Sequence, residues 1–319
     1  MKRTKNIFEF ATKELSQDAF LRWLFENWNS AFEDVNIASR ELLRHFLGFP
    51  LEVDMNITYV ETLAQKGKID VLIFCTVNNN NYVIAIEDKT ITTTHDNQLD
   101  RYAYYMNKNW DNKGKHIYIL YKTNLLTERE KQEAIDAKWS TFDIKSIHRI
   151  FSNLKIDIKN HFLKDYVDYI ESLYDDLATE LPREIKDWNM KNWYNFALTH
   201  KLKLPNNFYT EFGNYQNKYI YIAFLVETDF KLFPYLEIRS RDFNAGSFIF
   251  RILIPDKKEK YTEVNVKKWK ESINKSEMFK VQNNAKQIGI NKINDSVKTI
   301  EELEILVLEY IGEYRKLMF

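Results

Sequence analysis

The hydrophobic period of the chain changes near residue 50, and this change constrains the fold more than any other feature of the sequence. Before it, apolar side chains recur at the spacing of amphipathic helices. After it, they alternate with polar ones or form short apolar runs, which is typical of strands. The predicted elements are helices over 17–29, with Ser16 as its N-cap, and 34–47, ended by Gly48, followed by strands over 53–59, 68–77 and 82–88.

Helical and strand patterns alternate after the third strand. A helix that follows one strand and precedes another carries the chain across the face of a sheet, so the fourth strand is expected to join the same sheet. The order α-β-β-β-α-β therefore predicts an α/β fold with a mixed sheet flanked by helices. The further predicted elements are helices over about 94–109 and 128–137, strands over 116–121 and 141–144, and helices within 146–178.

A second domain is expected beyond Leu181-Pro182, where the first series of elements ends. The predicted domains are therefore 1–180 and 181–319, and the second has an α+β pattern with no recognisable functional motif. Its predicted elements are helices over 188–200, 264–273 and 299–317, and strands over 219–227, 236–240 and 248–254.

The composition limits the kinds of protein that this chain can be. Its 319 residues include 22 Phe, 19 Tyr and 7 Trp, which excludes a disordered chain because most of these side chains must be buried. Lys+Arg and Asp+Glu are each 46, so any nucleic-acid binding must depend on a local patch. Cys75 is the one cysteine, which excludes an internal disulfide and a cysteine-based zinc site. We expect a cytoplasmic protein with no membrane partner, because no apolar run approaches the roughly 20 residues of a membrane span.

Two acidic segments on neighbouring predicted strands carry the chemical signal. One is Gly67-Lys68-Ile69-Asp70 and the other is Ile86-Glu87-Asp88-Lys89. Because side chains alternate along a strand, Glu87 and Lys89 point to one face and Asp88 to the other. If the strand register allows it, Asp70 and Glu87 converge beside Lys89. Two carboxylates with an adjacent ammonium group form an oxygen-rich cation site of the kind that Mg²⁺ prefers.

These residues and their context resemble the PD-(D/E)XK nuclease superfamily. Asp70 matches the first acidic position, and Glu87-Asp88-Lys89 matches the E-x-K element. Gln98-Leu99-Asp100-Arg101-Tyr102 resembles the Q-x-x-x-Y element of part of the superfamily. The resemblance covers about residues 10–145 and departs from the motif at Ile69, where proline is common. It implies a restriction-endonuclease-like αβββαβ core.

The resemblance also implies roles for these residues. Asp70 and Glu87 are then metal ligands, with the backbone carbonyl of Asp88 as a third, and Lys89 is the catalytic lysine. The implied cofactor is Mg²⁺, with Mn²⁺ as a substitute.

Two helices are expected to complete this site. Gln98 and Tyr102 share a helix face and would flank the active site or the substrate phosphate. Some superfamily members add an acidic residue from the first helix. Glu14 is the preferred candidate and Asp18 the alternative, because Asp18 also suits the first turn of a helix.

The implied activity is metal-dependent hydrolysis of phosphodiester bonds in nucleic acid, DNA rather than RNA. The alternative is a catalytically silent module that keeps the nuclease fold and binds nucleic acid or a protein partner in defence or repair. A protein partner or a homodimer is compatible with either.

Asp70, Glu87 and Lys89 could also form a purely structural ion-pair cluster, and Gln98 and Tyr102 could be ordinary surface residues. The lysines that surround Trp269, and those at 257–260, are more typical of a solvated face than of a phosphate-binding patch. His95 is more typical of a cap or a surface position.

Overall fold

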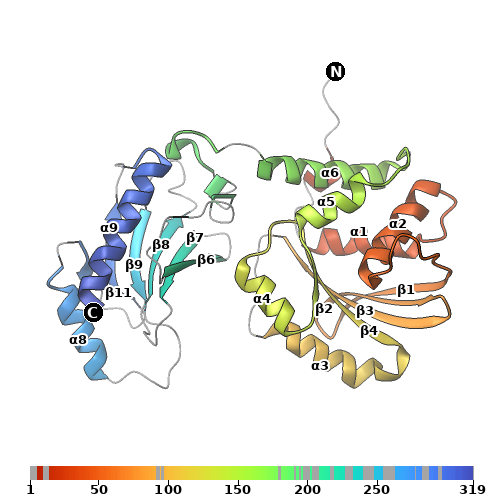
Figure 1. Cartoon of the computed structure of the whole chain (residues 1–319), viewed down its shortest axis with the longest axis horizontal. Helices are drawn as coiled ribbons and strands as arrows, with labels where there is room; N and C mark the ends of the chain where they lie inside the picture. Colours follow the sequence, from red (N-terminus) through yellow and green to blue (C-terminus); the bar gives the residue numbers. More distant parts are fainter. Residues whose placement is uncertain are drawn as a thin grey trace. The chain divides into compact units, whose positions relative to one another are not determined.

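The chain divides into two compact units, Met1–Thr179 and Glu180–Phe319 (Figure 1). Their structure is given by a computed structural model. The residues that it describes are 6–9, 14–90, 94, 97–178, 181–189, 192–193, 195–196, 202, 208–215, 219–226, 233–239, 248–253, 263–276, 278–281, 287–293 and 297–318.

A mixed five-stranded sheet forms the centre of the first unit. Its strand order is β1-β2-β3-β4-β5, with antiparallel pairs among the first three strands and parallel pairs from β3 to β5. The strands are β1 (Ile57–Lys66), β2 (Ile69–Val77), β3 (Asn80–Lys89), β4 (Lys115–Lys122) and β5 (Ser140–Phe142). This arrangement confirms the predicted fold class.

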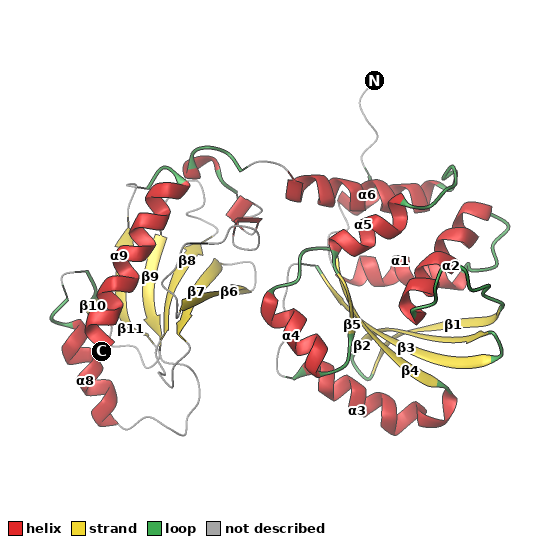
Figure 2. Cartoon of the chain, viewed as in Figure 1, coloured by secondary structure: helices red, strands yellow, loops and turns green. Residues whose placement is uncertain are grey.

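Helices cover both faces of this sheet, with α3 and α4 on one face and α1, α2, α5 and α6 on the other (Figure 2). On the α3 face, Leu99, Tyr102 and Met106 pack against Leu72 and Val83 of the strands. The bounds of the helical elements are η1 (Ile7–Glu9), α1 (Glu14–Glu26), α2 (Glu33–Leu47), α3 (Gln98–Trp110), η2 (Asp111–Lys113), α4 (Glu128–Asp136), α5 (Ile144–Ser152) and α6 (His161–Ala178).

The start of β1 differs from the prediction over 53–59. The alternating pattern is present there, yet the strand begins at Ile57 and continues to Lys66. Side chains of α2 bind the backbone carbonyls of the earlier segment. Arg44 Nη1 donates to the Val53 carbonyl at 2.6 Å, and Arg40 Nη2 donates to that of Met55 at 2.5 Å. This segment therefore follows the end of α2 instead of extending the sheet.

Two helix starts also differ from the prediction. Ser16 lies inside α1, which already includes Glu14, so it is not the N-cap. Helix α3 begins at Gln98 and not near residue 94, because Asn97 has a left-handed backbone with φ of 51°. By contrast, α2 ends as predicted at Gly48, whose φ of 70° suits glycine.

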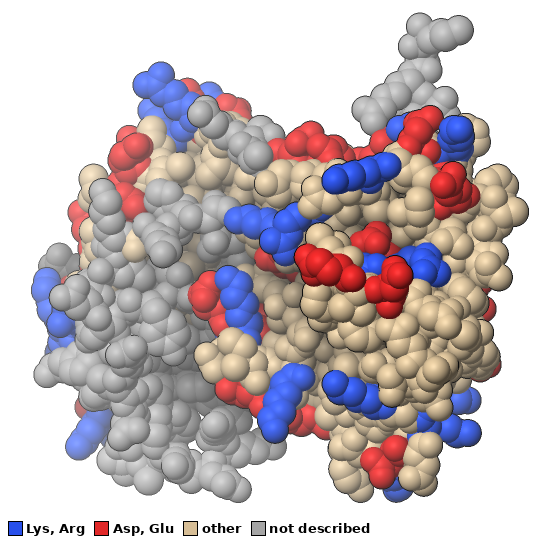
Figure 3. Space-filling view, turned by 45° about the vertical axis from the view of Figure 1, so that its right-hand side comes forward, with Lys and Arg blue, Asp and Glu red and all other residues tan. Residues whose placement is uncertain are grey.

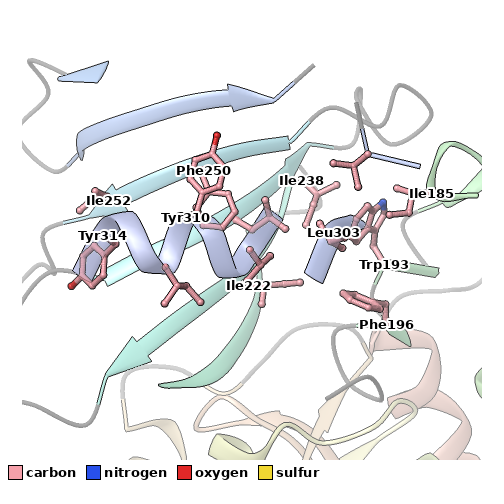
Figure 4. Packing of buried hydrophobic residues seen from close by; sticks show 14 of the residues in the cluster. Ile185, Trp193, Phe196, Ile222, Ile238, Phe250, Ile252, Leu303, Tyr310 and Tyr314 are labelled. Carbon is pink, nitrogen blue, oxygen red and sulfur yellow. The ribbon is translucent and has the colours of Figure 1, made fainter. Parts of the chain in front are cut away.

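The second unit contains a six-stranded antiparallel sheet of order β10-β11-β9-β8-β7-β6. Helix α9 packs against it, and its Tyr310 ring stacks on Phe250 with centroids 4.3 Å apart (Figure 4). The predicted helix over 188–200 lies largely outside the described residues. The bounds are η3 (Ile185–Asp187), β6 (Phe208–Tyr215), β7 (Tyr219–Val226), β8 (Phe233–Arg239), β9 (Phe248–Leu253), α8 (Glu263–Ile273), β10 (Lys280–Val281), β11 (Gln287–Ile293) and α9 (Ile300–Met318).

None of the helices in the described part of the chain is both long enough and apolar enough to cross a bilayer.

Candidate active site

The register between β2 and β3 places Asp70 opposite Glu87. Val71 pairs with Ile86 in this antiparallel ladder, so the next position along brings the two acidic residues together. Asp70 Oδ2 also accepts a hydrogen bond of 2.9 Å from the backbone N–H of Asp88. This hydrogen bond links Asp70 of β2 to the Glu87-Asp88-Lys89 segment of β3.

Glu87 is the centre of the polar contacts at this end of β3. Its Oε1 forms an ion pair with Lys89 Nζ and accepts a hydrogen bond from Gln98 Nε2. The same Gln98 nitrogen donates to the hydroxyl oxygen of Tyr102 at 2.9 Å. The structure therefore brings Asp70, Glu87, Lys89, Gln98 and Tyr102 into one cluster, with the last two supplied by the first turns of α3.

Burial controls the electrostatics of the cluster. Glu87 is fully buried, and loss of hydration is the main reason why its pKa rises to about 8. The Lys89 ammonium group acts in the opposite direction, whereas the charge of Asp70 and a hydrogen bond with it raise the pKa further. Burial also raises the pKa of Tyr102. Burial thus disfavours the ionised form of Glu87 more than the Lys89 ammonium group favours it.

Asp88 points to the opposite face of the sheet, as alternation predicts. Its Oδ1 accepts a hydrogen bond from Gln17 of α1, and its side chain is fully buried. The hydroxyl groups of Tyr121 and Tyr166 lie 2.9 Å apart on this face. Burial raises the pKa of both, and the charge of Asp88 is a smaller cause in the same direction. The Asp88 side chain is therefore part of the packing against α1 and lies away from the Glu87 cluster.

The donor set of the cluster fits a hard divalent cation. Glu87 Oε2 and Gln98 Oε1 are buried oxygens for which the described residues provide no hydrogen-bond partner. Mg²⁺ binds proteins through one or two carboxylates while it keeps several of its waters. The described residues contain no group of three or more His, Cys, Asp and Glu side chains that could hold a metal ion. A protein site made only of Asp70, Glu87 and backbone or amide oxygens is consistent with that finding.

Other residues considered from the sequence have different positions. Asp18 is buried on α1, beside the Gln17 that contacts Asp88. The Glu14 side chain, His95, the Trp269 side chain and residues 257–260 lie outside what the structure describes. Cys75 is buried on β2, and burial raises the pKa of its thiol to about 12, which makes it a packed residue and not a reactive one.

A second buried lysine beside the site was missed by the sequence reasoning. Lys122 of β4 pairs in register with Lys89 of β3, and its Nζ contacts both carboxylate oxygens of Glu130 at 2.8 and 2.9 Å. Glu130 also accepts a hydrogen bond from the backbone N–H of Thr127, which completes a capping box at the start of α4. The motif Thr127-x-x-Glu130 was the available signal, because it marks a helix start directly after a strand that ends in lysine.

Comparison with protein families identifies the class to which this fold and site belong. A family model described as the PD-(D/E)XK nuclease superfamily matches residues 5–171, which is just over half of the chain. The chain therefore belongs to the PD-(D/E)XK nuclease superfamily, whose members are mostly metal-dependent nucleases. Searches of curated proteins and of solved structures each found no match.

Proposed function

We propose that this protein hydrolyses phosphodiester bonds in nucleic acid, with DNA as the more suitable substrate, and that it needs Mg²⁺ or Mn²⁺. One observation carries the proposal: Asp70, Glu87 and Lys89, from two neighbouring strands, meet Gln98 and Tyr102 of α3 in a single cluster, in which all residues but Asp70 are buried. Family membership supports the same class of reaction.

Asp70 and Glu87 are the proposed metal ligands, with the backbone carbonyl of Asp88 as a third. Glu14 of α1 is retained as a possible additional ligand by resemblance alone. A bound Mg²⁺ supplies a Lewis acid that stabilises the negative charge of the phosphoryl group and lowers the pKa of a water. The residues fit this role because the β2–β3 register, continued one position beyond Val71 and Ile86, brings Asp70 next to Glu87.

Lys89 is the proposed catalytic lysine. Its ammonium group is held at Glu87, so it is directed at the same point as the carboxylates. A positioned ammonium group can stabilise the charge that develops on the phosphoryl oxygens, or orient the attacking water. Gln98 orients Glu87 through its amide N–H, and Tyr102 closes the cluster on the side of α3.

The distribution of charge indicates how nucleic acid would be held. The face shown in Figure 3 carries Lys and Arg side chains interspersed with Asp and Glu side chains in its described part, in agreement with a formal net charge of zero. Attraction by the whole molecule is therefore weak, and the substrate has to be held by local contacts near the cluster.

Cleavage of labelled single- and double-stranded DNA and RNA, with Mg²⁺, Mn²⁺ or EDTA, tests the proposal. We expect metal-dependent cleavage that is lost in Lys89→Ala. The matched control is Lys115→Ala, which removes an exposed lysine from the other end of the same parallel strand pair. If the protein binds nucleic acid but cleaves none of these substrates with either metal ion, the silent-module alternative would be supported. Cleavage by a folded Lys89→Ala protein at the wild-type rate would refute the role of the lysine.

A further inference from the structure

The turn that joins β1 to β2 lies directly beside the proposed metal ligand Asp70. Lys66 pairs with Ile69, so Gly67 and Lys68 form a two-residue hairpin turn. Their φ angles of 63° and 70° are both left-handed, as the tight turns of β-hairpins often require. Glycine adopts this conformation without strain, but lysine does not.

The opposite end of β2 provides an internal comparison. Val77 pairs with Asn80, so the turn to β3 consists of Asn78 and Asn79, with φ angles of 50° and 61°. Asparagine is the residue after glycine that best tolerates left-handed angles. Two turns of the same kind thus flank one strand, and only the turn at the Asp70 end places a lysine in the unfavourable conformation.

Contacts on both sides hold the Gly67–Lys68 turn in place. A Cβ atom on Gly67 would lie only 2.1 Å from Cε1 of Tyr105, so the turn packs closely against α3. Gln65, which also has a left-handed φ of 52°, donates from Nε2 to Asp70 Oδ1 at 3.3 Å. The turn therefore has a defined position relative to the carboxylate of Asp70.

The Lys68 side chain is exposed, and within the described part of the chain it forms no ion pair. It is two residues before Asp70, so their Cα atoms are at most about 7 Å apart. Lys89 and Lys122, which lie at the cluster or beside it, have carboxylate partners instead. Lys68 thus keeps a cation available at the edge of the cluster.

We propose that Lys68 binds a phosphate of the nucleic-acid strand next to the one that is cleaved. This inference rests on the proposed function, because it assumes that the substrate is a phosphodiester chain bound at Asp70 and Glu87. A strained backbone persists at a position where the surrounding structure holds it, and such positions cluster at functional sites. A lysine contact to a phosphate positions the strand without reading its sequence.

The test measures binding and stability together in the full chain. Anisotropy of fluorescently labelled DNA is recorded over a range of salt concentrations, with EDTA present so that no cleavage occurs. The variants are Lys68→Asn and Lys68→Gly, with Lys115→Asn as a control of equal charge change at the far end of the sheet. Thermal unfolding of each protein is followed by circular dichroism, and cleavage is measured separately with Mg²⁺.

Both Lys68 variants should bind several-fold more weakly than the wild type, equally on different sequences. The slope of log affinity against log salt concentration should fall by about 0.7 to 0.9, the value of one lost phosphate contact. Their melting temperatures should rise by about 2 to 4 °C because the strain is removed. Lys115→Asn should resemble the wild type in binding.

Opposite changes of stability and binding are not expected of a residue with a merely structural role. A wild type that cleaves while both Lys68 variants keep its salt slope would overturn this inference and leave the proposed function intact. Lower melting temperatures in both variants would also overturn it, because Lys68 would then be a stabilising part of the turn. A wild type that neither binds nor cleaves nucleic acid would overturn the proposed function, and the inference with it.

Discussion

Asp34 and Glu87 are both buried carboxylates of the first unit, yet their surroundings shift their pKa values in opposite directions. At the start of α2, burial acts to raise the pKa of Asp34, but backbone N–H groups outweigh it and hold that pKa below its ordinary value. Asn160 donates to Asp34 Oδ2 at 2.6 Å and Lys159 at 2.7 Å, and Val35 donates to Oδ1 at 2.9 Å. At the end of β3, burial dominates and raises the pKa of Glu87 to about 8.

The contrast is between a carboxylate held by backbone donors and the carboxylate proposed as a metal ligand. Both oxygens of Asp34 are occupied by the backbone of the chain itself, so the residue joins α2 to the start of α6. Glu87 has its second oxygen buried without a partner among the described residues. A buried acidic group that lacks its full set of donors is costly to the fold, and such groups are found where a ligand or a reaction requires them.

The largest expected effect is the loss of cleavage activity when a charged residue of the Glu87 cluster is replaced. We expect Asp70→Ala, Glu87→Ala and Lys89→Ala each to lower kcat/KM by about 10²–10³-fold, or roughly 3–4 kcal/mol of barrier, because each removes a charge from the phosphoryl centre. Cleavage rates measured on folded proteins, with circular dichroism as the control for folding, test this. An active Glu87→Ala protein would mean that its unusual pKa has no catalytic meaning.

The second largest effect is on the free energy of unfolding when Asp34 is replaced. Asp34→Ala should lower it by about 2 kcal/mol, because three backbone donors lose a charged acceptor. Chemical denaturation measures this loss, and kcat/KM of the folded fraction should stay near that of the wild type. A drop in kcat/KM comparable to that of Lys89→Ala would show that the two carboxylates do not have separate roles.

Low pH should remove the contribution of Asp34 to the free energy of unfolding. In the unfolded chain this carboxyl group has its ordinary pKa near 3.8, and in the folded chain its pKa is lower. Its stabilising effect is therefore complete above about pH 5 and is lost as the pH falls through the lowered value. The difference in unfolding free energy between wild type and Asp34→Asn should stay constant from pH 7 to about pH 5 and shrink below pH 4. A difference that grows in acid would contradict the assignment.

The smallest effect on activity is expected at Asp88. Its side chain contacts Gln17 on the α1 face, and Asp88→Asn preserves both an oxygen acceptor and the backbone carbonyl. Cleavage should therefore remain within several-fold of the wild type. An equal loss in Asp88→Asn and Glu87→Ala would indicate that the faces of β3 are assigned one residue out of register.

Much of the candidate site could be predicted from the sequence because strand geometry is local. Alternation along β3 places Glu87 and Lys89 on one face and Asp88 on the other, and the structure has them so. Helical spacing likewise places Gln98 and Tyr102 together, and their hydrogen bond confirms it. Their catalytic roles stay predictions.

What the sequence could not predict depends on distant partners. The start of β1 is decided by arginines of α2 that occupy carbonyls of the preceding segment. The Thr127-x-x-Glu130 motif predicts the start of α4, but only the packing of α4 brings Glu130 to Lys122 and makes the lysine part of a buried ion pair. Each of these features needs the position of another element, which a local pattern does not contain.

The sequence by itself determined which residues are the candidates for the chemistry and which face of its own strand or helix each one occupies, because backbone periodicity is a property of neighbouring residues. The tertiary structure alone decided that Asp70 lies opposite Glu87, because register depends on how two strands pair. It also decided that both oxygens of Asp34 have donors whereas Glu87 Oε2 has none among the described residues, since two of the three backbone donors of Asp34 come from a segment more than 120 residues away in the chain. Burial and hydrogen-bond partners are set by packing, and packing gives two similar carboxylates opposite electrostatic properties.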